Sequence, residues 1–356
     1  MKKFQLLFTI VIVVAMMTSC ENAGKEKAAS TKKAKTITGA GATFPQPYYN
    51  KIFKTYTNEK GLLVTYGGIG SGGGIRSLKD KIVDFAASDA FLDDQKLANM
   101  PCEVLHVPTC LGAVVAAYNL PGELKLKFTP ELMEGIFMGE IKKWNDAKIA
   151  AVNPGIKLPE IEITVVYRSD GSGTTFIFSD YMSKVSTKWK EKIGAGKALK
   201  WPIGIGAKGN PGVSGTINQT EGAIGYIGSE YAFAMGIPAA SIQNKAGNFI
   251  LPSVESVSSA AKVEMLVDTR VSLTNTDAVD GYPISSFSWL ILYKEQNYSN
   301  RSPDQALQTI KLIDWMLSSE AQKETSKVHY APLPDDVIAK AKAVLAKVTY
   351  NGKPLK

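Results

Sequence analysis

The sequence predicts an α/β protein with two domains. Short apolar segments of strand character alternate with helix-like segments, a pattern that favours mainly parallel sheets flanked by helices. About 320 residues follow the N-terminal region, more than a single core usually serves. A long apolar segment at 103–118, with Gly112 in its middle, is typical of a strand that leaves one domain and enters another.

The N-terminal region has the features of an export signal. Two lysines precede an apolar run over residues 6–17, and small residues lead to Cys20. The run is too short for a comfortable membrane span, and this pattern is typical of a signal peptide processed for lipid attachment. We expect residues 1–19 to be the signal peptide, Cys20 the lipidated residue, and 20–35 a polar, flexible tether. An uncleaved anchor is the alternative.

Apolar runs and the turn residues between them predict the order of elements. Ser302 followed by proline has the form of a helix start. A glycine pattern at 204–209 is followed by Asn210-Pro211, so we expect a loop there and not a helix. The expected strands are 62–66, 83–87, 103–118, 161–167 and 287–293, and the expected helices are 74–83, 174–185, 303–317 and 335–348.

Charge and histidine content argue against several functions. The formal net charge is +8, but the lysines are scattered and no basic patch is interleaved with aromatic residues. Nucleic-acid binding is therefore not expected, although a mildly basic surface attracts small anions. His106 and His329 have no partner at metal-ligand spacing, so we expect neither a metal site nor any cofactor, and no catalytic histidine.

The two cysteines of the expected folded part flank a strand-like segment. Cys102 and Cys110 stand on either side of residues 103–107, and an extended strand would hold them too far apart for a disulfide. We expect two buried or partly buried free thiols. Export to an oxidising compartment leaves a disulfide open as the alternative.

Three loops rich in glycine and hydroxyl residues carry the functional signal. They lie at 39–44, 67–74 and 168–176, each where a strand-like segment gives way to a helix-like one. A helix N-terminus offers unpaired N–H groups and partial positive charge, glycine allows close approach, and serine or threonine adds a hydroxyl donor. Together with Arg168, these loops predict a cage for a small oxyanion at the carboxyl ends of strands.

Two enzyme functions are alternatives. Residues 68–73 fit the GxGxxG pattern, and Asp89 follows about 20 residues later, as in dinucleotide-binding oxidoreductases. The export signal and the short following helix argue against that interpretation. Ser172 lies in a serine-glycine turn, which suggests an extracytoplasmic phosphatase, but the turn is not a nucleophile elbow and no histidine is placed as its base.

Nine motifs in one order resemble those of a known family. The chain is similar, over nearly all of 36–356, to the phosphate-binding proteins of high-affinity phosphate ABC transporters. The motifs are GAGATFP (39–45), GGIGSGGG (67–74), VDFAASDA (83–90), KKWND (142–146), NPGIKLP (153–159), RSDGSGTTF (168–176), WPIGIGAKGN (201–210), EGAIGYI (221–227) and YPISSF (282–287).

The resemblance implies a non-enzymatic receptor with a type II periplasmic-binding-protein-like fold. Two lobes, joined by crossover strands, would close around inorganic phosphate. Lobe I would combine residues 36–111 and 286–356, and lobe II would hold 112–285. The implied partners are phosphate and the permease subunits of the ABC transporter. The implied protein is an extracytoplasmic, lipid-anchored monomer without a cofactor.

The resemblance also implies which residues bind the ligand. Donors would come from both lobes, Asp170 would hold Arg168 in place, and Asp89 would face the ligand. The family often has two serines in the second loop, whereas here Gly72 follows Ser71, which removes a secondary hydroxyl. The implied phosphate-binding residues are Ala42, Thr43, Phe44, Ser71, Asp89, Arg168, Ser172, Gly173 and Thr174.

Asp89 has a chemical rationale beside the resemblance. A carboxylate repels an anion unless the anion supplies a proton, which phosphate does and sulfate does not. Asp89 is therefore expected to accept a hydrogen bond from phosphate and to exclude sulfate. Arsenate carries the same proton and is not excluded. The alternative role for Asp89 is a surface or capping acid after a strand.

Overall fold

The computed structural model describes residue 34 and residues 36–355. The predicted signal peptide, Cys20 and most of the predicted tether lie outside the described residues. Within the described residues, every helix is too short or too polar to cross a bilayer.

A mixed sheet of nine strands runs through the described part of the chain. Its order is β2-β1-β3-β12-β4-β8-β6-β7, with β11 beside β12. The strands are β1 (Thr36–Gly41), β2 (Leu63–Gly68), β3 (Phe85–Ser88), β4 (Val104–Tyr118), β6 (Thr164–Arg168), β7 (Ile205–Ala207), β8 (Ala223–Gly228), β11 (Leu273–Thr274) and β12 (Ile284–Tyr293).

The sheet has two parallel halves. In the first half β1 pairs in parallel with β2 and β3, and in the second half β6 pairs in parallel with β7 and β8. Strand β4 joins them: its residues 104–113 pair antiparallel with β12, and residues 114–118 pair antiparallel with β8. All residues of β4 and β12 are buried, which explains their long apolar runs. The predicted strand at 103–118 is confirmed, and it links the two halves of the sheet.

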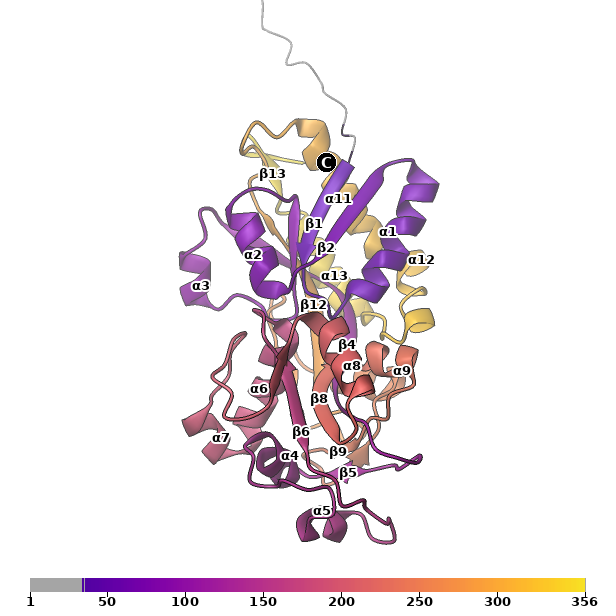
Figure 1. The fold of residues 1–356 in the computed structure, drawn as a ribbon. Helices are drawn as coiled ribbons and strands as arrows, with labels where there is room; N and C mark the ends of the chain where they lie inside the picture. Colours follow the sequence, from indigo (N-terminus) through magenta and orange to yellow (C-terminus); the bar gives the residue numbers. More distant parts are fainter. Residues whose placement is uncertain (1–33, 35, 356) are drawn as a thin grey trace, which may run out of the picture. The chain divides into compact units, whose positions relative to one another are not determined.

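Helices surround each half of the sheet, as Figure 1 shows. Near the first half lie α1 (Gln46–Lys60), α2 (Ser71–Lys79), α3 (Asp94–Ala98), α11 (Pro303–Met316), α12 (Ser319–Gln322) and α13 (Asp335–Leu345). Near the second half lie α4 (Pro130–Phe137), α5 (Ala147–Val152), α6 (Gly173–Val185), α7 (Thr187–Lys192), α8 (Gly209–Gln219) and α9 (Ser229–Met235). The remaining helix, α10, spans Val254–Ala260.

Two predictions of local structure were wrong. Helix α2 begins at Ser71, three residues before the expected start, although its first turn is glycine-rich. A Cβ on Gly74 would lie 2.5 Å from the Ala40 carbonyl oxygen, so glycine lets the helix lie directly on β1. The expected loop around Asn210 is the start of α8. Pro211 is tolerated there because the first turn needs no intrahelical N–H donor.

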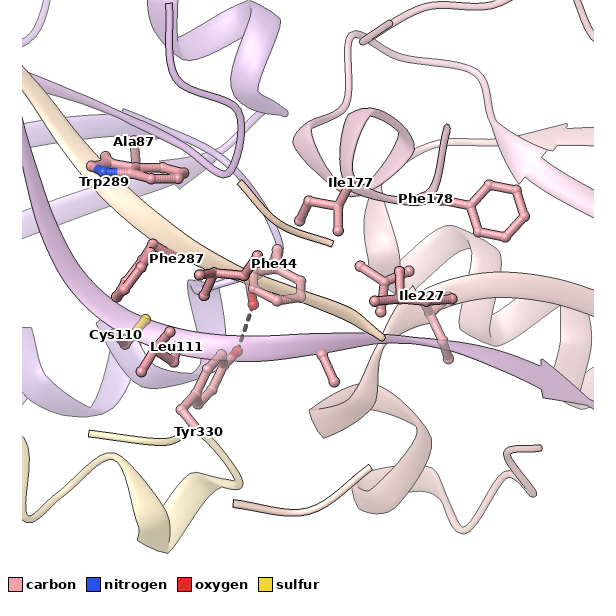
Figure 2. Close-up of a cluster of buried hydrophobic side chains, with 14 of the residues drawn as sticks. Phe44, Ala87, Cys110, Leu111, Ile177, Phe178, Ile227, Phe287, Trp289 and Tyr330 are labelled. Carbon is pink, nitrogen blue, oxygen red and sulfur yellow. Dashed lines mark hydrogen bonds between the residues drawn. The ribbon is translucent and has the colours of Figure 1, made fainter. Parts of the chain in front are cut away.

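The core where β4 changes partners anchors the first loop. Figure 2 shows Phe44 beside β4 and close to Tyr330. The Tyr330 hydroxyl donates to the Phe44 carbonyl at 2.5 Å, and the two rings meet edge to face with centroids 6.3 Å apart. A Cβ on Gly112 would lie 2.5 Å from the Phe44 ring. The glycine in mid-strand therefore makes room for the aromatic ring that anchors the loop.

Both cysteines of the described region are free thiols. Cys110 is buried, as expected, but Cys102 is exposed, so the expectation that both are at least partly buried was wrong for Cys102. Cys102 lies in the turn that precedes β4 and not in the strand. His106 is structural: its Nε2 accepts a hydrogen bond from the Leu92 N–H at 3.1 Å.

A buried carboxylate connects the first strand, β1, to helix α11. Asp84 accepts hydrogen bonds from the Thr38 N–H at 2.7 Å and from the Gln305 Nε2 at 2.9 Å. It also forms an ion pair with Arg301, and the two side chains are only 10% and 6% exposed. The stability of the fold depends on this ion pair, because without Asp84 the desolvated guanidinium of Arg301 would have no counterion.

We predict that Asp84→Asn lowers the free energy of unfolding by about 3–5 kcal/mol, because it leaves the Arg301 charge buried without a counterion. Urea unfolding measures the change. Asp277→Asn is the matched control, since Asp277 is 87% exposed in its ion pair with Lys245, and it should cost less than about 1 kcal/mol. Equal losses in the two variants would contradict the prediction.

Candidate anion-binding site

The three glycine and hydroxyl loops lie at the carboxyl ends of β1, β2 and β6. They head α1, α2 and α6, respectively. The second and third loops touch directly, because the Gly72 N–H donates to the Gly171 carbonyl at 2.8 Å. Two helix N-termini from different halves of the sheet therefore meet at one place, which concentrates N–H donors and partial positive charge there.

Arg168, at the end of β6, brings a full positive charge to this place. Its Nε and Nη2 donate to the Asp170 carboxylate at 2.7 and 2.6 Å, and its Nη1 lies 3.3 Å from the Thr174 Oγ1. Three of the five N–H groups of the guanidinium are thus used, and two remain. Although burial opposes it, hydrogen bonding from Arg168 holds the pKa of Asp170 below its ordinary value.

Helix α6 offers two amides without an acceptor. Ser172 is its N-cap, and the Ser172 Oγ accepts from the Thr175 N–H at 3.0 Å. The Ser172 N–H itself donates to the Lys197 carbonyl at 2.8 Å. Within residues 36–355, the N–H groups of Gly173 and Thr174 have no hydrogen-bond acceptor. These are the first two helical positions, where the helix provides no partner.

The first loop contributes Thr43 and Phe44 but not the amide of Ala42. The Ala42 N–H donates to the Ala87 carbonyl at 2.9 Å and is already used. Within the described ranges, the N–H groups of Thr43 and Phe44 have no acceptor. The Thr43 hydroxyl oxygen accepts two hydrogen bonds from Asn210, so this loop contacts the N-terminus of α8.

Ser71 and Asp89 lie against the start of α6. A Cβ built on Gly173 would be 2.5 Å from the Ser71 Oγ and 2.6 Å from the Asp89 Oδ2. Only glycine fits at this position of α6. Ser71 is fully buried at the first position of α2. The backbone N–H of Asp89 approaches the Ser71 Oγ only loosely, at 3.5 Å.

Asp89 is buried with half of its carboxyl group unsatisfied. Its Oδ1 accepts from the Ser288 hydroxyl at 2.6 Å, whereas its Oδ2 has no hydrogen-bond partner among the described residues. Burial raises the pKa of Asp89 to about 7, against the opposing effects of the Ser288 hydrogen bond and the charges of Arg168 and Lys197. Its 2% exposure excludes a surface role, and neither carboxyl oxygen accepts a hydrogen bond from a helix N–H among the described residues.

Eight of the sequence-predicted residues thus form one contiguous cluster, with Asp170 supporting it. Ala42 adjoins the cluster but has no free amide. Sequence reasoning missed Asn210, Ser288, Tyr231 and Tyr330, which position the cluster from outside the three loops. Asn210 is the last residue of the WPIGIGAKGN motif, so the motif could have pointed to it. The following Pro211 favoured a loop at this position instead.

Neither enzyme alternative is supported by the site. Within the 68–73 pattern the Gly72 amide is already bonded to the Gly171 carbonyl, and α2 has only nine residues. Ser172 caps α6, and no histidine hydrogen-bonds to it in the described part of the chain. A nucleophilic serine needs such a base.

Comparisons with known proteins identify the relatives. A model of the PBP superfamily domain matches residues 26–320. The phosphate-binding protein PstS of Pasteurella multocida is 42% identical over 322 residues, covering 88% of this chain and 91% of the relative. PstS of Methanocaldococcus jannaschii is 32% identical over 355 residues, covering 92% of this chain and 90% of the relative.

Solved structures share the fold. The ancestral soluble variant of the human phosphate-binding protein superposes with a TM-score of 0.70 at 20% identity, covering 90% of this chain and 99% of that chain. The periplasmic phosphate-binding protein PfluDING, solved with phosphate, has a TM-score of 0.66 at 22% identity, covering 86% and 93%. The predicted periplasmic-binding-protein-like α/β fold is confirmed. The chain belongs to the PBP superfamily and, within it, to the family of PstS phosphate-binding proteins.

Proposed function

We propose that this protein is an extracytoplasmic receptor that binds inorganic phosphate and delivers it to the permease of an ABC transporter, without chemical turnover. The observation that carries the proposal is the set of unused hydrogen-bond donors around one arginine. Several amides of the three loops have no acceptor in the described residues, and Arg168 retains two N–H groups there. Among these amides are those of Thr43, Phe44, Ser71, Gly173 and Thr174.

Such a set suits a small tetrahedral anion. A buried charge needs many hydrogen bonds, and bonds from a charged donor are roughly twice as strong as neutral ones. Arg168 and Asp170 cancel each other's charge in part, so neutral amides and hydroxyls would supply most contacts. Relatives named phosphate-binding proteins, and a solved neighbour with bound phosphate, support phosphate as this anion.

We propose two lobes that follow the halves of the sheet. Lobe I would comprise 36–111 and 286–356, and lobe II would comprise 112–285. Strands β4 and β12 would serve as the crossovers about which the lobes close. The receptor would act as a monomer, and the permease would recognise the closed, loaded form.

Asp89 would read the protonation state of the ligand. Its unpaired Oδ2 would share one proton with an oxygen of phosphate, supplied either by the ligand or by Asp89 itself. Sulfate carries no proton near neutral pH, so an ionised Asp89 would repel it. Arsenate would satisfy the same geometry.

We predict that Arg168→Ala weakens the binding of phosphate by about 3 kcal/mol or more, roughly a hundredfold in Kd, because it removes charged donors and leaves the Asp170 charge without a counterion. Isothermal titration calorimetry measures the loss. Arg76→Ala removes the same charge from an exposed position on α2 and should bind as the wild type does. Unchanged affinity in Arg168→Ala would put the site elsewhere.

We predict that Asp89→Asn binds phosphate only modestly more weakly but accepts sulfate. In the wild type, sulfate should bind better as pH falls below about 7, because Asp89 then carries the proton itself. The variant should lose this pH dependence. Titration of both proteins with both anions at pH 6 and pH 8 tests this, and equal discrimination in the two proteins would remove Asp89 from the selectivity role.

Asp89→Asn should also change the free energy of unfolding of the protein without ligand. The pKa of Asp89 is higher in the folded chain, about 7 against an ordinary 3.8, so the folded state binds more protons between these values. Stability therefore falls as pH rises through this window. Asp89→Asn should remove that slope and stabilise the protein at pH 8 by about 2–4 kcal/mol, as urea unfolding would show.

We propose that Cys20 carries the lipid that anchors the receptor to the membrane. Cys20→Ser should then release the protein from the membrane fraction of cells into the soluble extracytoplasmic fraction, as fractionation and immunoblotting would detect. Cys102→Ser, at an exposed cysteine, should stay with the membranes. Retention of Cys20→Ser in the membrane fraction would favour an uncleaved anchor instead.

A further inference from the structure

Asn210 stands between the two halves of the candidate site. It is the second residue of α8 and is fully buried. It touches a hydroxyl of the first loop, on Thr43, and a hydroxyl of α6, on Thr174. The proposed ligand contacts do not include it.

The orientation of the Asn210 side-chain amide is determined by the backbone. The Gly228 N–H lies 3.0 Å from the Asn210 Oδ1, and an N–H requires an acceptor there. The oxygen must therefore face Gly228, and the NH₂ group must face the two threonines. The NH₂ group donates one hydrogen to the Thr43 Oγ1 at 3.0 Å and the other to the Thr174 Oγ1 at 3.1 Å.

The hydroxyl oxygens of both threonines then accept as many hydrogen bonds as they can. Thr43 accepts a second hydrogen bond from the Asn210 backbone N–H at 3.0 Å, and Thr174 accepts a second from the Arg168 Nη1 at 3.3 Å. A hydroxyl oxygen has two lone pairs, so neither has one left. Each keeps one O–H, and neither O–H has an acceptor within residues 36–355.

We propose that Asn210 is a positioning residue that makes the Thr43 and Thr174 hydroxyls obligatory donors toward the anion. The inference rests on the proposed function. A hydroxyl that rotates freely can donate or accept, but one whose lone pairs are occupied can only donate. Both protons are thereby oriented before the ligand arrives, which avoids reorganisation on binding.

The arrangement also determines which oxygen of the ligand carries its proton. Oxygens that face Thr43 and Thr174 meet only donors, so they must be unprotonated. The protonated oxygen is directed to the Asp89 Oδ2, the unpaired acceptor that lies next to Gly173. Asn210 therefore contributes to selectivity without touching the ligand.

A double-mutant cycle measured by phosphate calorimetry tests this role. Asn210→Leu should raise the Kd for phosphate roughly 10- to 100-fold, by analogy with the loss seen when outer partners that orient metal ligands are removed. The exposed Asn218 lies on the same helix, and Asn218→Leu should bind within about twofold of the wild type. Asn210→Ala, which is too small to clash, should give the same loss if the leucine variant folds poorly.

The background variants separate positioning from a structural role. In Thr43→Val/Thr174→Val, which has no hydroxyls to orient, Asn210→Leu should change Kd by less than about threefold. In Thr43→Ser/Thr174→Ser, which keeps the hydroxyls, the full loss should return. The inference would be overturned if Asn210→Leu weakened phosphate binding equally in the valine and serine backgrounds, or did not weaken it in the wild-type background. Phosphate binding by the unmodified protein would remain in either case. Absence of phosphate binding by the unmodified protein would instead overturn the proposed function, and the inference with it.

Discussion

The carboxylate of Asp170 is the contact on which the candidate site depends. It holds Arg168 through two hydrogen bonds, at 2.7 and 2.6 Å. Its Oδ1 also accepts from the Gly209 N–H at 3.0 Å, and Gly209 begins the helix that carries Asn210. A side chain on Gly70 would collide with the Oδ2. One half-buried acid therefore orients the arginine, contacts the start of α8 and limits how closely the second loop approaches.

Two carboxyl groups in this small region, the half-buried Asp170 and the buried Asp89, have opposite electrostatic roles. Asp170 is satisfied by a guanidinium and an amide, and its pKa stays below the ordinary value despite burial. Asp89 accepts a hydrogen bond from one hydroxyl, and its other carboxyl oxygen has no partner among the described residues. Burial raises its pKa. The first is a fixed charge that cancels part of Arg168. The second is poised to gain or lose a proton, so the local environment alone gives the two carboxyl groups opposite pKa shifts.

Much of this site could be predicted from the sequence because its signals are local. A loop rich in glycine and hydroxyl residues between a strand and a helix predicts free N–H donors from only a few neighbouring residues. The ion pair of Arg168 with Asp170 likewise joins residues two positions apart. The long strand at 103–118 could be predicted because a strand buried on both faces is continuously apolar.

The residues that position these loops could not be found in this way. Tyr231 and Tyr330 lie 188 and 286 residues from the groups they bind, so no spacing rule connects them. The role of Asn210 was not predicted because Pro211 favours a loop unless the start of the helix is known. Local rules describe where a donor arises, whereas its direction depends on contacts that only the tertiary fold creates.

The first loop shows how direction is achieved. A peptide unit is planar, and its C=O and N–H point in opposite directions, so holding the carbonyl aims the amide. The Tyr66 hydroxyl holds the Ala42 carbonyl at 2.6 Å, which aims the Thr43 N–H, and the Tyr231 hydroxyl holds the Thr43 carbonyl at 2.5 Å, which aims the Phe44 N–H. Burial raises the pKa of both phenols, so both remain donors. Tyr66 belongs to β2, in the same half of the sheet as the loop, but Tyr231 belongs to α9, beside the other half. The Thr43 amide is therefore oriented by its own half alone, whereas the orientation of the Phe44 amide requires the two halves to be together.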